Sequence, residues 1–594
     1  MISTNLNSMN KTIDSDTKLP KTKTLRRLLK LMSPYKKKVV FACICVILVN
    51  GAQLMKPYIL KLVIDDFLIK HVVQNGLYSI TTMGVLYFLL VVMSSFFSIA
   101  QVTLINKVGQ DIMKTLRGKV FKTIQLLPIG FLDKTSSGSL ITRATNDVEA
   151  LSEMYTDILI SLFQDVFLII GIIYTMIIIN AELALISFCV VPLMFGAVFI
   201  LKTKIKRNFV KMKSLIGKIN GFMAENISGM KIIQIFHGEK EKKEEFDELN
   251  NEYFKATLFQ VWMNSFLKPA ADVFQSLAVA ILIWYGMGKI YNQTLSIGVL
   301  YAFTTYIKQF FTPISDLADN YTTIQSALVS ADRIFELLDE EDNLENLDEG
   351  ISMDYFQGNI EFKNVWFSYN DKEWILRDVS FNIDKGQTAA FVGETGAGKT
   401  TIISLVSGFY KVQKGEILID GVNINHIKKR DLRRNIAVVL QDVFLFSGTI
   451  EKNITLSDKI EMAEIESALE ISHAKEVIDN FSKGINEPVM ERGSTLSAGQ
   501  RQLFSFARAI AHNPSIFVLD EATANIDTST EILIQKAIDN IAKERTTLII
   551  AHRLSTIRNA DIIIVLKNGE VLEMGNHNVL MEMGGYYKDL IVKG

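Results

Sequence analysis

Long apolar runs in the first half of the chain constrain its fold more than any other feature of the sequence. An α-helix needs about 20 mostly apolar residues to cross the hydrocarbon core of a bilayer. Charge-free runs of about that length or longer occur at Val39–Met55, Val72–Asn106, Val166–Ala181, Leu183–Leu201, Val273–Gly288 and Ile290–Ile307. Because these runs are apolar on every face, lipid suits them better than a soluble helical domain does. The sequence therefore predicts six membrane-spanning helices, with the last four paired as hairpins across short polar turns.

The distribution of Lys and Arg predicts how these helices are oriented. Ten of these residues lie within positions 1–38, and the connections between spans two and three and between spans four and five are also basic. The other three connections together carry only four, Lys56, Lys61, Lys70 and Lys289. Because Lys and Arg accumulate in cytoplasmic loops, we expect the N-terminus, both basic connections and the second half of the chain in the cytoplasm. Apolar residues at helical spacing in both basic connections predict that the spans continue as helices beyond the membrane.

Composition disfavours several other classes of protein. The formal net charge is −1, which disfavours nucleic acid as a partner, because binding to its phosphates needs clustered positive charge. Cys43, Cys45 and Cys189 lie in apolar runs without the spacing of a metal site, so we expect reduced core residues. Residues 1–24 are polar, include Pro20 and show no apolar segment typical of a signal peptide.

The second half of the chain has a different pattern. After an acidic stretch, Glu340 to Glu349, strand and helix patterns alternate from Ile360 to the end. Such alternation is typical of an α/β domain with a largely parallel sheet. We therefore expect a polar N-terminal tail at 1–35, a helical transmembrane domain at 36–328, a linker at 329–357 and an α/β domain at 358–594.

The most specific local pattern in this half is a glycine-rich loop that ends in Lys399 and Thr400. It follows an expected buried strand, Ala389–Val392, and opens an expected amphipathic helix, Thr401–Phe409. In such a loop the glycines let backbone N–H groups converge on phosphates, the lysine reaches the β- and γ-phosphates, and the hydroxyl ligates Mg²⁺. The predicted ATP-binding set is Gly393, Glu394, Thr395, Gly396, Ala397, Gly398, Lys399, Thr400 and Thr401. The domain is therefore predicted to be an α/β P-loop ATPase that binds ATP and Mg²⁺.

Two further strand ends carry side chains that ATP hydrolysis needs. The buried strand Ile516–Leu519 ends in Asp520 and Glu521. Asp520 is placed to hold Mg²⁺ through water and Glu521 to polarise the attacking water, although a solvated pair of acids is the simpler alternative. A third strand, Thr547–Ala551, delivers His552 to a position where a contact with the γ-phosphate is needed.

The run LSAGQ at 496–500 lies shortly before the acidic strand. Together with the glycine-rich loop, this run makes the chain resemble exporters of the ATP-binding cassette (ABC) family over nearly its whole length from about Lys36. The resemblance implies that Ser497, Gly499 and Gln500 bind ATP held by the ATPase domain of a second half-transporter. A single chain would then complete neither of the two ATP sites.

The resemblance also assigns roles to other residues. It implies that Tyr369 stacks on adenine, that Gln441 contacts Mg²⁺ and senses the membrane domain, and that Asp527 lies in a loop that crosses the dimer interface. It further implies that Phe131 to Arg143 and Ile233 to Glu239 are coupling helices. These are the parts of the two cytoplasmic connections that carry motion between the domains.

The function that the resemblance implies is ATP-driven export. Hydrophobic or amphipathic substrates, drugs or lipids, would leave the cytoplasm or the inner leaflet, most simply across a bacterial plasma membrane. An ATP-gated regulatory or channel-like protein, an importer and a peptide exporter are the alternatives. Ala498 stands in place of the family's usual glycine, and Asn525 departs from the usual loop at 524–527. Because both changes affect only the ATP site of the partner, they favour a heterodimer over a homodimer.

Three charged residues in or beside the apolar runs are also predicted to have a role. Counting about 1.5 Å per residue from the outer helix ends, Asp165, Asp272 and Lys308 fall in the inner half of the bilayer. A charge that faces lipid there is costly. We therefore expect all three to point inward, where they pair with one another or face a wet cavity in which the acids bind cationic substrates.

Overall fold

Two units make up the chain. The computed structural model describes residues 21–69, 79–340, 344–370, 372–456, 458–520, 528–543, 545–550 and 557–593. The first, which we call the helical unit, contains Met1–Thr123 and Gly138–Asp339. The second, the α/β unit, contains Ile124–Ser137 and Glu340–Gly594. A helical domain followed by an α/β domain is the fold class that the sequence predicts, and the order of elements confirms it.

The helical unit consists of long helices joined by short turns. Its helices include α2 (Lys21–Leu31), α3 (Lys36–Leu62), α4 (Ile80–Leu126, whose end reaches the second unit), α6 (Ser137–Thr142), α7 (Val148–Glu153), α8 (Leu159–Ile179), α9 (Ala181–Phe188), α10 (Val191–Ser228), α11 (Met230–Ile235), α12 (Glu239–Tyr291) and α13 (Ile297–Leu338). In the described residues, five helical stretches are long and apolar enough to cross a membrane, namely Ser33–Ile69, Ile80–Leu126, Ser137–Ile179, Ala181–Ser228 and Glu239–Tyr291.

The sixth expected span lies at a different position from the prediction. The predicted run Ile290–Ile307 is divided, because α12 continues to Tyr291 and α13 begins only at Ile297. The side chain of Ser296 caps α13 by accepting a hydrogen bond from the backbone N–H of Val299 at 3.4 Å. With 42 residues α13 is long enough to cross a bilayer, but its polar residues keep it out of the five apolar stretches.

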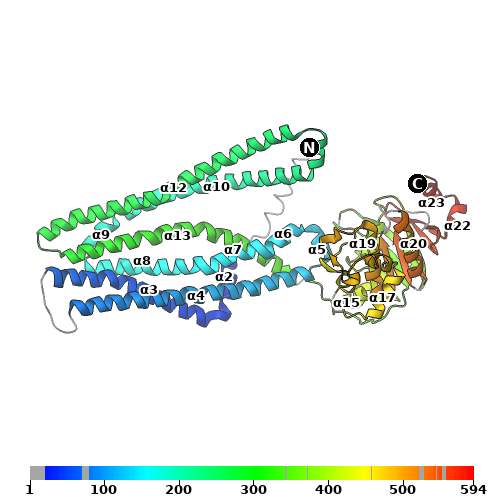
Figure 1. Cartoon of the computed structure of the whole chain (residues 1–594), viewed down its shortest axis with the longest axis horizontal. Coiled ribbons are helices and arrows are strands. Elements are labelled where there is room, and N and C mark those ends of the chain that lie inside the picture. The colour runs from blue at the N-terminus through cyan, green and yellow to red at the C-terminus, as the bar shows by residue number, and fades with distance from the viewer. Residues whose placement is uncertain are drawn as a thin grey trace. The chain divides into compact units, whose positions relative to one another are not determined.

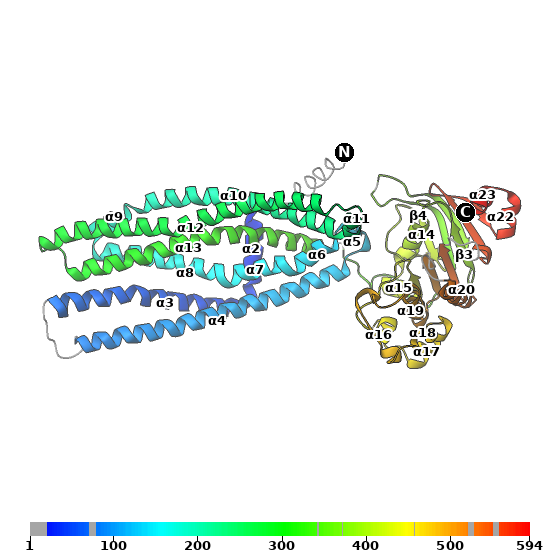
Figure 2. The ribbon, with the colours of Figure 1, turned by 45° about the horizontal axis from the view of Figure 1, so that its top comes forward.

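Four helices are far longer than a bilayer requires. Helices α4, α10, α12 and α13 have 47, 38, 53 and 42 residues, against about 20 for one crossing. The prediction that spans continue as helices beyond the membrane is therefore confirmed. Figures 1 and 2 show α10 and α12 side by side along much of their length.

A polar contact joins α2, the first described helix, to the end of α13, the last helix of the unit. Helix α2 forms within the predicted polar tail, and the guanidinium of Arg27 donates two hydrogen bonds of 2.7 Å to the carboxylate of Asp339. Asp339 directly follows α13, which extends into the range predicted as linker. The domain boundaries themselves stay a prediction.

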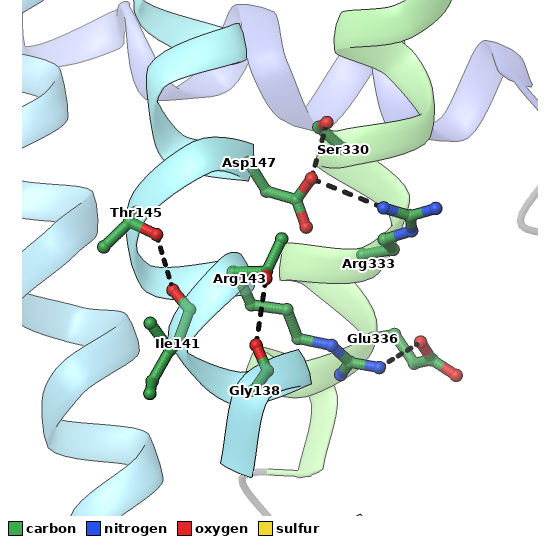
Figure 3. A network of polar contacts seen from close by, with 9 residues as sticks. Gly138, Ile141, Arg143, Thr145, Asp147, Ser330, Arg333 and Glu336 are labelled. Carbon is green, nitrogen blue, oxygen red and sulfur yellow. Dashed lines mark hydrogen bonds and ion pairs between the residues drawn. The ribbon is translucent and has the colours of Figure 1, made fainter. Parts of the chain in front are cut away.

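A second polar network joins α13 to the segment η3 (Arg143–Asp147), which is wound as a π-helix between α6 and α7. Figure 3 shows its members. The hydroxyl of Ser330 donates to the buried carboxylate of Asp147 at 2.8 Å, and Arg333 pairs with the same oxygen at 3.6 Å. Arg143 pairs with Glu336 at 3.4 Å. These contacts fix the end of the first predicted coupling region on the last helix of the unit.

The α/β unit contains two larger sheets. A six-stranded sheet has the order β12-β11-β3-β10-β9-β6, with all neighbours parallel except β12, and a four-stranded antiparallel sheet has the order β2-β1-β4-β5. The strands are β1 (Ile360–Phe367), β2 (Leu376–Ile383), β3 (Thr388–Val392), β4 (Lys414–Ile419), β5 (Val422–Asn423), β6 (Ile436–Val439), β9 (Ile516–Asp520), β10 (Thr546–Ile550), β11 (Ile562–Lys567) and β12 (Glu570–Gly575).

Helices cover these sheets and form the rest of the α/β unit. They include α5 (Ile129–Lys134), α14 (Lys399–Val406), α15 (Lys429–Asn435), α16 (Ile450–Thr455), α17 (Met462–Ile471), α18 (Lys475–Ile478), α19 (Ala498–Ala511) and α20 (Thr528–Ala542). Strands β3 and β10 are buried along their whole length, as expected of parallel strands covered on both faces. Figure 2 shows α16, α17 and α18 gathered away from β3 and β4. The turn between β11 and β12 has positive φ at both Asn568 and Gly569, as a two-residue type I′ hairpin turn requires.

Candidate active site

Parallel strands place the predicted catalytic segments at one edge of the six-stranded sheet. In the sheet register Asp520 of β9 lies opposite Ile550 of β10, which in turn lies opposite Phe391 of β3. The carboxyl ends of β3, β10, β9 and β6 therefore meet at the same edge. In open α/β sheets this edge is where ligands bind.

The glycine-rich loop follows β3 and has the form of a phosphate cradle. Gly396 and Gly398 have φ values of +88° and +102°, which side chains rarely adopt. A Cβ on Gly398 would lie 2.6 Å from the side chain of Leu376. Lys399 is 7% exposed, and its ammonium group donates to the carbonyl oxygens of Gly393 at 2.7 Å and of Glu394 at 3.0 Å. The loop thus surrounds one fixed positive charge at the N-terminus of α14, an arrangement that fits the phosphates of ATP.

The predicted Mg²⁺ ligands are grouped by the same sheet edge. Thr400 lies in the first turn of α14, Asp520 is the last residue of β9, and Gln441 follows β6, the strand next to β9. Thr400 and Gln441 are exposed, and Asp520 is half-buried. Hydroxyl, amide and carboxylate oxygens are the ligands that Mg²⁺ prefers, so the donor set fits the ion. Their roles stay a prediction.

Several residues with predicted roles lie outside the described part of the chain. These are Glu521, Asn525, Asp527 and His552. Glu521 directly follows Asp520, and His552 comes two residues after the end of β10. Their predicted roles remain open.

Tyr369 follows β1 and contacts the start of α14. Its hydroxyl is 3.2 Å from the Thr401 hydroxyl, and its ring makes edge-to-face contacts with Phe367 and Tyr410. The side chain is 39% exposed. A half-exposed aromatic ring beside the phosphate loop is compatible with stacking on adenine, as the family resemblance implies.

Tyr410 is a residue that sequence reasoning missed. Its hydroxyl donates to the carboxylate of Asp133, and a Cβ on Gly130 would lie 3.0 Å from its ring. Asp133 and Gly130 both lie in α5, which is part of the α/β unit. A ring that touches Tyr369 thus also holds the first predicted coupling helix. The only sequence signal was an aromatic pair, Phe409-Tyr410, just after the phosphate-loop helix.

The predicted signature residues begin helix α19. Ser497 is the N-cap, and its hydroxyl accepts from the N–H of Gln500 at 3.1 Å, while the Gln500 side chain accepts from the N–H of Ser497 at 3.0 Å. Gly499 is buried, and Ser497 and Ala498 are exposed. This capping box leaves a well-ordered helix N-terminus, which favours an anion.

A helical membrane unit joined to an α/β unit with a phosphate cradle defines a membrane-bound P-loop protein. Comparisons with known proteins show which family of membrane-bound P-loop proteins this chain resembles. The ABC transporter transmembrane region family matches residues 39–314, and the ABC transporter family matches residues 376–524. A probable multidrug resistance ABC transporter ATP-binding/permease protein of Bacillus subtilis (strain 168), YheH, is 42% identical over 506 residues, 84% of this chain and 75% of the relative.

Two further relatives cover nearly the whole chain. An ATP-dependent lipid A-core flippase of Syntrophus aciditrophicus (strain SB) is 32% identical over 565 residues, 95% of this chain and 93% of the flippase. The structure of a bacterial Atm1-family ABC exporter with ATP bound aligns with a TM-score of 0.77 and 26% identity, covering 94% of this chain and 98% of that one. The chain belongs to the ABC transporter family and has the organisation of an exporter subunit.

Proposed function

We propose that this chain is one half of an exporter dimer that moves hydrophobic or amphipathic drugs or lipids out of the cytoplasm or inner leaflet. Its family membership makes it an ATPase coupled to transport. The named relatives include a probable multidrug resistance protein and a lipid A-core flippase, which supports a substrate of this chemical class. The bacterial relatives support a bacterial plasma membrane, and the distribution of Lys and Arg supports a cytoplasmic N-terminus and α/β unit.

The buried ammonium of Lys399 inside the phosphate cradle carries the ATPase part of the proposal. According to this proposal, Lys399 binds the β- and γ-phosphates of ATP. Mg²⁺ is held, directly or through water, by Thr400, Gln441 and Asp520. Bound Mg²⁺ would neutralise charge that develops on the phosphates. Glu521 would accept the proton of the attacking water, and His552 would orient the γ-phosphate.

Exposed apolar residues support the second half-transporter in this proposal. Helix α11 and the residue after it overlap the coupling region that the family resemblance marks at Ile233 to Glu239. There Ile232, Ile235 and Phe236 are 63%, 70% and 78% exposed. Three large apolar side chains so close together are costly to leave in water. We propose that they dock on the ATPase domain of the partner.

The partner in this proposal is a different chain rather than a second copy. At Ala498 a Cβ stands on the first residue of α19, where backbone would approach the partner's phosphate closely. In a homodimer this side chain would affect both sites. In a heterodimer it affects only the partner's ATP, and the ATP bound by this chain meets the partner's own signature.

Two substitutions test the site. Glu521→Gln should retain ATP binding and lower turnover by about a hundredfold or more, the usual contribution of a general base. Lys399→Ala should weaken ATP binding itself, because it removes the charge that faces the phosphates. Lys385→Ala, at an exposed position outside the loop, is the matched control and should leave both unchanged. Near-normal turnover of Glu521→Gln in the assembled complex would contradict the assignment.

A further inference from the structure

A polar layer crosses the apolar interior of the helical unit where α3, α8 and α13 pack against one another. On the side of the layer towards the outer helix ends, a Cβ on Gly171 would touch Leu54, and the hydroxyl of Tyr306 donates to the Leu54 carbonyl at 2.7 Å. An apolar cluster there includes Leu168, Ile172, Phe303, Phe310 and Ile314. We call the residues Asn50, Gln164, Asp165 and Asp316, which lie next to this cluster, the acidic layer.

One hydrogen bond fixes the register of α8 and α13 at this layer. The side-chain amide of Asn320 donates to the hydroxyl of Ser161 at 2.9 Å. Figures 1 and 2 show that α8 ends where α13 begins, so the two helices are antiparallel. One turn from this bond along each helix lie Asp165 and Asp316. Their carboxylates accordingly interact with each other electrostatically.

The layer contains buried polar atoms whose hydrogen-bonding capacity is unused. Asp165 is 8% exposed and Asn50 is 4% exposed. The amide nitrogen of Asn50 donates to the Gln164 carbonyl at 2.9 Å. Within the described residues, however, Oδ1 of Asn50 and Oδ2 of Asp165 have no hydrogen-bond partner. Such atoms cost free energy when buried, and two neighbouring carboxylates repel each other. A positive charge in the acidic layer would interact favourably with the buried oxygen atoms and would also offset the repulsion between the two carboxylates.

We propose that the acidic layer binds the positively charged group of a lipophilic cation. The proposal names a substrate class and therefore rests on the proposed export function. Asp165 lies 14 residues before the end of α8 at Ile179, about 21 Å from that end. Asp316 is exposed on the single chain, which gives the ligand a side from which to approach.

An organic cation fits better than a metal ion. Metal ions of the calcium and magnesium type need about six or more oxygen ligands at fixed distances, and the layer offers two carboxylates and one free amide oxygen. Among the described residues, no group of three or more His, Cys, Asp or Glu could hold a metal ion. A diffuse organic charge requires no fixed coordination shell.

The sequence predicts that Asp165, Asp272 and Lys308 point inward, where they pair with one another or face a wet cavity. The structure distinguishes Asp165 from the other two, and the prediction of a shared cavity stays open. Only Asp165 is buried, whereas Asp272 and Lys308 are exposed on the single chain. The acidic neighbour of Asp165 is Asp316, a pairing that the sequence does not indicate.

Equilibrium binding of two ions of the same size and opposite charge tests the proposal. The probes are tetraphenylphosphonium and tetraphenylborate, measured without ATP on the full-length exporter in lipid nanodiscs. Asp165→Asn and Asp316→Asn should each weaken tetraphenylphosphonium binding by about tenfold, without weakening tetraphenylborate binding. Asp272→Asn removes a carboxylate from α12, outside the layer, and should change neither.

Other outcomes would overturn the cation site. Unchanged phosphonium binding in both variants, or equal weakening for both ions, would leave the carboxylates with a purely structural role. Loss of sodium binding in Asp165→Asn with unchanged phosphonium binding would assign the layer to an inorganic ion. If Asp165→Asn does not fold, the exposed Asp316 variant decides. Basal ATP hydrolysis of the unsubstituted samples is measured in parallel, so that failure of the ATPase proposal is distinguished from failure of the cation site.

Discussion

At the scale of single residues, Gly398 shows that the phosphate loop depends on the absence of a side chain. Gly396 and Gly398 share a left-handed backbone, but only Gly398 is close to another group, the fully buried Leu376. An alanine at either position carries the backbone penalty of about 1–2 kcal/mol. At Gly398 the contact with Leu376 adds roughly 1–3 kcal/mol of overpacking.

We therefore predict that Gly398→Ala lowers thermal stability and affinity for an ATP analogue more than Gly396→Ala does. Melting temperature and equilibrium binding, measured on both variants of the full-length protein, provide the comparison. Equal effects of the two substitutions would show that the losses of stability and affinity come from the backbone conformation alone and not from the packing against Leu376.

At the scale of elements, Tyr410 connects the first predicted coupling helix, α5, to the aromatic residues beside the phosphate loop. Burial and the neighbouring Asp133 carboxylate raise the pKa of Tyr410, so the hydroxyl stays protonated and remains a donor near neutral pH. We predict that Tyr410→Phe, which keeps the ring contact with Tyr369, retains basal ATP hydrolysis but reduces its stimulation by substrate several-fold. Asp133→Asn should act in the same direction. Full stimulation in both variants would rule out a role for this bond in coupling.

A second element-scale prediction concerns the start of α13. Asp65, which is buried in the π-helical segment η2 (Val63–Ile69), accepts from the Ser296 hydroxyl at 2.6 Å and from the N–H of Gly298 at 2.7 Å. Because it satisfies the helix N-terminus from a distant segment, Asp65→Ala should cost about 0.5–2 kcal/mol, as loss of a helix cap does. Asp65→Asn keeps one acceptor oxygen and should cost less. Melting temperature in lipid nanodiscs measures both, and an unchanged value for Asp65→Ala would contradict the capping role.

At the scale of the whole molecule, the prediction concerns the partner. Expressed alone, this chain should hydrolyse ATP poorly, and co-expression with a second half-transporter should restore activity. Ala498→Gly should then change turnover little, because it repairs only the site that the partner's ATP occupies, which we expect to hydrolyse ATP slowly anyway. A stable dimer of this chain alone with two equally active sites, measured by ATP turnover and by nucleotide occupancy, would refute the heterodimer.

The sequence by itself determined the features that depend on local chemistry. Apolar runs long enough for a bilayer, a glycine-rich loop between a buried strand and a helix, and the Asn568–Gly569 hairpin each follow from neighbouring residues alone. The periodicity and the special backbone conformations that define such elements are properties of short segments. For the same reason the sequence placed the phosphate loop and the acidic end of β9, and these two predictions required no knowledge of distant contacts.

Tertiary structure alone decided which distant groups meet. Tyr410 lies 277 residues from Asp133, and Asp65 lies 233 residues from Gly298, yet both pairs are in contact. The sixth span was placed too early because the charge-free run includes the polar turn before α13, and the cap at Ser296 marks where that helix begins. Asp316 acquired its significance only when the packing of α8 against α13 brought it beside Asp165, because a single charge in a long helix carries no local sign of its neighbour.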